Sequence, residues 1–268
     1  MRHFPLFLIA LSGLGCTSLG PMPAMTGSTG AIERRPGVEA QVAVTPGFFL
    51  SSATTEDVSG RPSQQAAGWL DAGEWVGAQG LAVGGRYVGG DDSNGYGEPM
   101  VRYRHAVDSE DRFTLQAAGF GTVASGSNSG ASYEATRLGA EVAFDGRVTP
   151  KSSWLEVHGF GGASVLGLDA SGTYCTAPAT GIGVDCREDG TDHVVSGDVA
   201  GAFPAAFAGI GIDMARHLPI AVHGARLEAM AAGGMMPEIR DGVRTDTKPW
   251  TTFGVAITVR AGAAEETK

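Results

Sequence analysis

From residue 37 onward the chain is a succession of segments in which apolar and polar residues alternate with a period of two. Strict alternation places successive side chains on opposite faces of an extended strand. Each segment is followed by residues typical of turns, whereas only residues 63–75 favour a short helix. The chain is therefore predicted to be all-β. The predicted strands span residues 37–50, 76–89, 98–107, 112–123, 132–144, 154–166, 205–215, 220–233 and 250–260.

The connections between the predicted strands alternate in length. Residues 108–111, 145–151 and 216–219 are short connections, whereas 90–97, 124–131, 167–204 and 234–249 are longer. Tight turns at one end and long loops at the other are typical of antiparallel membrane barrels. We therefore predict an antiparallel up-and-down β-barrel of about eight strands over residues 76–262, with the long loops on one side. Residues 37–75 are predicted to be an N-terminal strand and a linker; a second strand within them would make ten.

Composition supports strands and narrows the class of partner. The chain has 42 glycines among 268 residues, and many of them lie inside apolar stretches. Glycine costs a helix about 1 kcal/mol relative to alanine, whereas it suits strands that curve tightly. The net charge of −10 argues against nucleic acid as a partner.

Ionisable residues recur on the face opposite the apolar one. In residues 98–107, for example, Val101 and Tyr103 alternate with Arg102 and Arg104. Ordinary soluble cores almost never contain so many ionisable groups, because each unpaired buried charge costs several kcal/mol. We therefore predict that the apolar face meets lipid and that paired charges fill the interior without leaving an open channel. The predicted inward residues are Arg86, Arg102, Arg104, Gln116, Arg137, Glu141, Glu156, His158, Asp213, Arg226 and Glu228.

With its alternating strands, sorted loops and mixed-charge inner face, the chain resembles the small outer-membrane barrels of the OmpA/OmpX type over about residues 76–262. The resemblance implies a barrel in the bacterial outer membrane whose role is structural or interactive and whose long loops meet a surface partner. We expect a monomer surrounded by outer-membrane lipid, with no cofactor and no nucleic-acid partner. Two alternatives are a lipid-anchored, soluble, lipocalin-like barrel that holds a small hydrophobic ligand, and a membrane barrel that acts on lipid acyl chains.

The N-terminus resembles the signal peptide of a bacterial lipoprotein. Arg2 and His3 precede an apolar run over residues 4–15, which ends at Cys16. The run is too short to span a bilayer, and its order of charged, apolar and small residues is that of a secretory signal. The resemblance implies cleavage before Cys16 and acylation of that cysteine; an ordinary cleaved signal and a retained anchor are the alternatives. Residues 1–15 are then the signal peptide, 16–36 a flexible tether and 263–268 a C-terminal tail.

The other two cysteines, Cys175 and Cys186, lie close together in a segment rich in Gly, Thr and Asp. An exported chain meets an oxidising compartment, so we predict a disulfide that closes this loop. Closing about ten residues would stabilise the fold by roughly 3 kcal/mol. A metal-binding pair is the less favoured alternative, because no further cysteine or histidine lies at ligand spacing.

Enzyme chemistry has one weak candidate. His158 shares a face with Glu156 and lies near Ser153, which could supply a base, an orienting carboxylate and a nucleophile for ester hydrolysis. A hydrogen-bond network inside the barrel explains the same residues more simply. We therefore expect no catalytic, cofactor or metal site.

Overall fold

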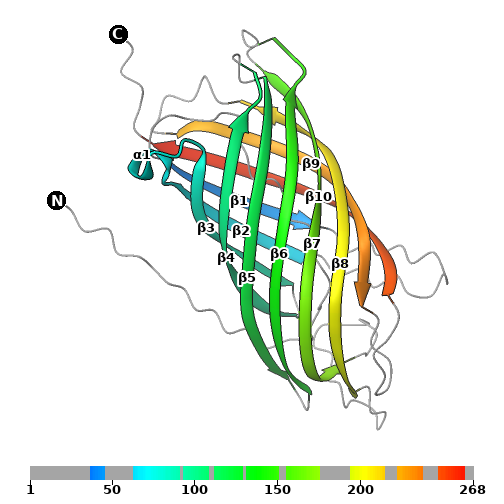
Figure 1. Ribbon diagram of the computed structural model, residues 1–268. Helices are drawn as coiled ribbons and strands as arrows, with labels where there is room; N and C mark the ends of the chain where they lie inside the picture. The colour runs from blue at the N-terminus through cyan, green and yellow to red at the C-terminus, as the bar shows by residue number, and fades with distance from the viewer. Residues whose placement is uncertain are drawn as a thin grey trace.

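The computed structural model describes residues 37–45, 63–90, 93–108, 112–128, 131–150, 155–175, 194–214, 222–237 and 247–262. These residues form a closed antiparallel barrel in which every strand pairs with its neighbours in sequence and β1 closes the ring against β10 (Figure 1). The strands are β1 (Gly37–Thr45), β2 (Ser63–Asp71), β3 (Leu81–Gly90), β4 (Ser93–Ala106), β5 (Phe113–Asn128), β6 (Ala131–Arg147), β7 (Glu156–Cys175), β8 (Val194–Asp213), β9 (Val222–Pro237) and β10 (Thr247–Gly262).

The barrel has ten strands rather than the eight preferred from the sequence. β1 lies between β10 and β2, with Gly37 opposite Gly262 and Val44 opposite Val255. β2 lies where the linker and the helix were predicted, and among the described residues of that segment only α1 (Gly73–Val76) is helical. The barrel therefore begins at Gly37 and not at residue 76. The even number and the antiparallel order are those of bacterial membrane barrels.

The two ends of the barrel are connected differently. We call the end that holds Gly37 and Gly262 the terminal end, and the opposite end the distal end. Residues 46–62, 176–193 and 238–246 join strands at the distal end, as do the much shorter connections 91–92 and 129–130. The predicted long loops 90–97 and 124–131 were therefore wrong, because most of their residues extend the strands and pair across tight hairpins.

Turns at the terminal end are fixed by side chains. Asp108 Oδ1 accepts hydrogen bonds from the backbone N–H groups of Arg112 and Phe113, at 2.7 and 3.1 Å. Thr149 Oγ1 accepts one from Val157 N at 2.9 Å. Gly77 and Gly80 follow the end of α1 and have φ angles of 71° and 87°, in the left-handed region that favours glycine. No helix among the described residues is long and apolar enough to cross a membrane.

Glycines on the inner face make room for large neighbours. Gly211 lies on β8 opposite Glu228, and a Cβ added there would collide with the guanidinium of Arg226. Gly209 is likewise covered by the ring of Phe160. Glycine therefore appears inside these strands because a charged or aromatic side chain from the next strand lies across its Cα.

Replacing Gly211 by alanine should destabilise the barrel by at least about 1 kcal/mol, because overpacking displaces the buried Arg226. Gly159→Ala is the matched control, since a Cβ there meets no atom within 4 Å. Urea unfolding of the two variants in detergent measures the difference. Equal midpoints for both variants would contradict this account of the glycine.

Candidate functional site: an ionic network inside the barrel

The inner face carries a large set of buried polar and charged side chains. Nine of the ten charged residues predicted to face inward are buried there, and Glu156 at the terminal rim is half-buried. Gln116 is buried as well. The sequence analysis did not identify Glu39, Gln41, Gln65, Asp71, Glu98, Asp145, Arg147, Thr258 and Arg260, which are also buried. Most of the charged residues among them belong to three groups.

The first group, the Glu39 cluster, joins strands on both sides of the β1–β10 closure. Glu39 Oε1 accepts a hydrogen bond from Arg102 Nη1 at 2.9 Å, while its Oε2 lies 3.7 Å from Arg104 Nη1 and 3.6 Å from Arg260 Nη1. Asp71 contacts the same two arginines, with Arg260 Nη2 at 2.6 Å from Oδ2 and Arg104 Nη2 at 3.5 Å from Oδ1. Three arginines thus share two carboxylates.

The second group, the Glu98 cluster, lies further toward the distal end. Arg86 and Glu98 face each other on β3 and β4, with Arg86 Nε 3.0 Å from Glu98 Oε2 and Nη2 in closer contact with the same oxygen. Arg137 Nε from β6 donates to Glu98 Oε1 at 3.0 Å, so this bond passes over β5 and joins strands that are not neighbours. Glu141 is buried as well, in the electrostatic field of Arg86 and Arg102.

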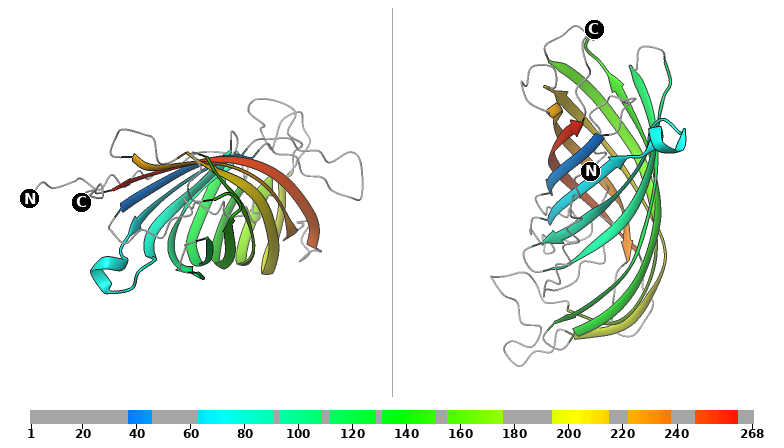
Figure 2. Two further views of the ribbon diagram at one scale, coloured as in Figure 1. Left: turned by 90° about the horizontal axis from the view of Figure 1, so that it is seen from above. Right: turned by 90° about the vertical axis from the view of Figure 1, so that its left-hand side faces the viewer.

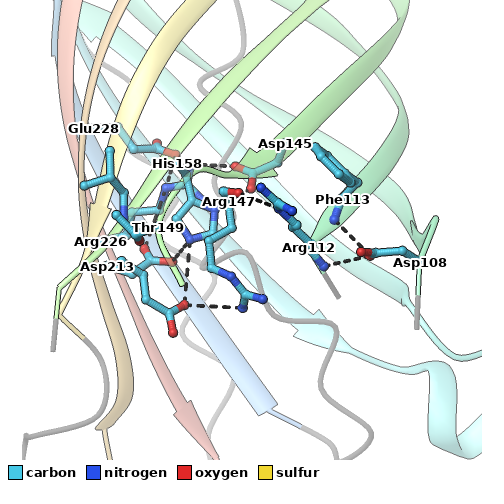
Figure 3. Close-up of polar contacts among 12 residues, drawn as sticks. Asp108, Arg112, Phe113, Asp145, Arg147, Thr149, His158, Asp213, Arg226 and Glu228 are labelled. Atoms are coloured by element: carbon cyan, nitrogen blue, oxygen red, sulfur yellow. Dashed lines mark hydrogen bonds and ion pairs between the residues drawn. The ribbon is translucent and has the colours of Figure 1, made fainter. Parts of the chain in front are cut away.

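The third group, the Asp145 cluster, connects β6 to β9 at the terminal end (Figure 3). Arg226 donates from Nη2 to Asp145 Oδ2 at 2.6 Å, and its Nε lies 3.0 Å from Glu228 Oε1. Asp145 Oδ1 is 2.7 Å from His158 Nδ1. Glu228 Oε2 in turn accepts from Gln41 Nε2 at 3.1 Å, which ties β9 to β1 across β10.

Aromatic rings cover several of these arginines. The guanidinium of Arg102 stands 4.2 Å from the ring centroid of Trp69, and that of Arg86 stands 4.8 Å from Phe120. Arg226 lies 5.5 Å from Phe160. Desolvated cation–π contacts of this kind stabilise the cations and exclude water from the ion pairs.

His158 is a member of the ionic network. Its Nδ1 faces Asp145 and its Nε2 lies 3.1 Å from Asp213 Oδ2, so both ring nitrogens point at carboxylates. Ser153, the serine considered as a nucleophile, lies outside the described residues. Among the described residues, no group of three or more His, Cys, Asp or Glu side chains is arranged to hold a metal ion.

The interior also contains apolar side chains, which the sequence analysis did not anticipate as an inner layer. Trp69, Met100, Phe120 and Leu166 form one buried cluster, and Leu168, Val199 and Phe203 belong to another. Phe160, Phe207, Met230 and Trp250 belong to a third. Paired charges and packed apolar side chains therefore share the interior, with Trp69 and Phe160 lying against Arg102 and Arg226.

The cysteines lie mostly outside the described part of the chain. Cys175 is the last residue of β7, whereas Cys16 and Cys186 are outside the described residues. The predicted acylation and disulfide therefore stay predictions.

Comparisons with known proteins give no family. The sequence matches no protein-family model and no curated protein. The structure is similar to neisserial surface protein A (TM-score 0.31, 11% identity, 84% of this chain and 96% of that one). It is also similar to the translocator domain of the autotransporter NalP from Neisseria meningitidis (TM-score 0.35, 12% identity, 85% and 88%). A third similar structure is Ail, the attachment invasion locus protein of Yersinia pestis (TM-score 0.27, 10% identity, 84% and 97%). Similarity at this level carries no functional argument.

Removing the cation of the Asp145 cluster should be costly. Arg226→Met leaves Asp145 and Glu228 buried without their shared partner, so we expect a loss of about 3–5 kcal/mol in the free energy of unfolding. Adding Glu228→Gln should recover part of that loss, since it removes one of the stranded charges. The exposed Arg112 is the control: Arg112→Met should cost less than about 1 kcal/mol. Denaturant unfolding in detergent that gave equal losses for Arg226→Met and Arg112→Met would refute the role of the network.

Proposed function

We propose that the chain is an integral β-barrel of the bacterial outer membrane with a structural or interactive role at the cell surface. The observation that carries the proposal is the opposite polarity of the two faces of the wall. Large apolar side chains point outward and are exposed, while arginines and carboxylates point inward and are buried. The outward set includes Val38, Val42, Leu70, Val83, Val101, Leu115, Leu138, Val142, Val165, Ile210, Leu227, Phe253, Val255 and Ile257.

Water is a poor solvent for such a surface. Monomeric soluble proteins rarely expose contiguous apolar patches larger than a few hundred Å². An outward apolar band around a closed barrel instead matches the hydrocarbon core of a bilayer, where every backbone group of the wall must be paired internally. A soluble lipocalin-like barrel would need the reverse arrangement, with polar residues outside.

Exposed aromatic side chains near the terminal end support the same placement. Phe113 and Phe144 stack with their ring centroids 6.1 Å apart, and Tyr103 stacks on His105 at 6.5 Å. All four side chains are exposed on the outer face, and Trp75 of α1 is exposed too. The amphipathic rings of Tyr103 and Trp75 favour the boundary between lipid and water.

The filled interior favours a role other than transport. Arg102, Arg226 and Glu98 are almost fully buried within the barrel, and packed apolar clusters lie beside them. A lumen occupied by its own side chains offers no path to solutes. The role therefore falls to what the barrel presents at its distal end, which includes the segment around Cys175 and Cys186 that we propose to be closed by a disulfide.

A charge on the outer face should prevent insertion. Val142→Arg places a guanidinium in the apolar band and should reduce the stability of the inserted barrel by about 2–4 kcal/mol. Thr136→Arg is the control. Thr136 is exposed on the same face of β6, six residues nearer the distal end. The outward residues of β6 at that level, Glu134 and Thr136, are polar. Folding into phosphatidylcholine vesicles, followed by heat-dependent gel migration, compares the two. Equal insertion of both variants would contradict the proposal.

We also propose that Cys16 carries the lipid anchor implied by the N-terminal sequence. Metabolic labelling with a fatty acid should mark the wild type but not Cys16→Ala, and the variant should stay in the outer membrane because the barrel itself is inserted. Release of Cys16→Ala as a folded soluble protein would show instead that the lipid was the only attachment.

A further inference from the structure

The barrel wall separates at one seam before its strands end. The hydrogen-bonded register of β4 with β5 runs from Ala106 opposite Thr114 to Met100 opposite Phe120, and it stops there. The next residue of β4 is Pro99, which has no N–H to continue the ladder. β4 continues beside β3 beyond this point, whereas β5 continues beside β6.

Beyond that seam, β5 is an edge strand. It pairs with β6 up to Asn128 opposite Ala131. β6 pairs with β7 up to Tyr133 opposite Gly172, and β7 with β8 up to Cys175 opposite Val194. Strands β5–β8 thus form a four-stranded sheet that continues past the ends of β1–β4, as the right-hand view of Figure 2 shows. Within the described part of the chain, no strand pairs with β5 over residues 121–128 on the side away from β6.

The backbone groups on that edge can be assigned from the turns. Phe113 O accepts a hydrogen bond from the N–H of Val107, directly after β4, whereas Arg112 O accepts one from the N–H of Arg147 in β6. Because successive residues of a strand direct their N–H and C=O groups to opposite sides, the odd-numbered residues of β5 face the open edge. Val123 and Ser125 therefore present their N–H and C=O groups there.

The sequence of this edge lacks the charged residues and prolines that protect many exposed strands. Residues 121–128 (GTVASGSN) include no lysine, no other charge and no proline. An unprotected edge of this kind is a template for another extended chain. Among the described strands, sequence and register together thus leave this edge of β5 available for strand addition.

Side chains beside the edge indicate what an added strand should carry. Val123 is 78% exposed on the outer face, opposite Thr136 of β6. Two residues along, Ser125 pairs with Glu134, whose exposed carboxylate is on the same face. Cross-strand neighbours favour apolar against apolar and opposite charge against charge. A complementary strand would place a β-branched residue beside Val123 and a lysine or arginine beside Ser125, from where its long side chain can extend across β5 toward Glu134.

We propose that the distal edge of β5 binds an extended, basic and β-branched peptide segment of another protein by strand addition. The bound segment lies beside residues 121–128 in the way that residues 100–106 of β4 lie beside residues 114–120. The proposal deepens the proposed surface role, on which it rests, because the sheet projects beyond the apolar band where Glu134 and Thr136 are exposed.

The test uses a fluorescent eight-residue peptide in which valine alternates with lysine and threonine, added to the full barrel in neutral phosphatidylcholine nanodiscs. Fluorescence anisotropy should give saturable binding to the wild type. Ser125→Pro removes an N–H that faces the edge and leaves the β5–β6 ladder intact, so binding should weaken at least about tenfold. Ser125→Ala keeps that N–H and should bind as the wild type does.

A second probe keeps the test decisive if Ser125→Pro folds poorly. The same peptide with alternate backbone nitrogens methylated has the same charge but cannot pair as a strand, and it should bind at least about tenfold more weakly. Equal binding of both peptides, equal binding to Ser125→Pro, or no saturation up to about 1 mM would overturn the proposal. So would a wild-type dimer that Ser125→Pro converts to a monomer, since the edge would then bind a second copy of the chain.

Heat-dependent gel migration of the same nanodiscs reports insertion separately, so failure of the proposed membrane insertion is distinguishable from failure of peptide binding.

Discussion

The pairing of charges across the lumen is the interaction on which the rest of the barrel depends. An apolar outer face makes the barrel wall compatible with lipid, but the polar residues of the strands then face inward. Arginines such as Arg102 and Arg226 are tolerable there only because Glu39, Asp145 and Glu228 meet them directly. The same contacts join β1 to β4 and β6 to β9, strands that are not neighbours in the barrel, and so they stabilise the closed shape.

Much of the fold was predictable because a two-residue period is a strong signal. The apolar face of β10 and the arginine-bearing face of β4 followed directly from alternation, and the structure places both as expected. β2 was missed because its outward residues, including Ala66 and Gly68, are too small to contrast with Gln65 and Trp69. Without β2, β1 had no neighbour on one side, so it was interpreted as a flanking strand.

The ionic network was predictable in part. Residues in the middle of predicted strands, such as Arg137 and Glu228, were assigned to the inner face from their alternation alone. Asp145 lay in a predicted turn and Glu98 at a predicted strand end, so neither gave a signal. Which carboxylate meets which arginine depends on the tilt and register of strands far apart in sequence, and alternation within one strand contains no information about that.

The central claim is that the outer face meets lipid while the inner face does not. Spin labels placed in turn at successive positions of β10, from Phe253 to Val259, test it most directly. The measurement is the accessibility of each label, in bilayers, to oxygen as a lipid-soluble relaxant and to a nickel chelate as a water-soluble one. The account predicts high oxygen accessibility at Phe253, Val255, Ile257 and Val259, and low accessibility to both relaxants at Gly254, Ala256 and Thr258. Nickel accessibility along the outward positions, or loss of the two-residue period, would contradict it.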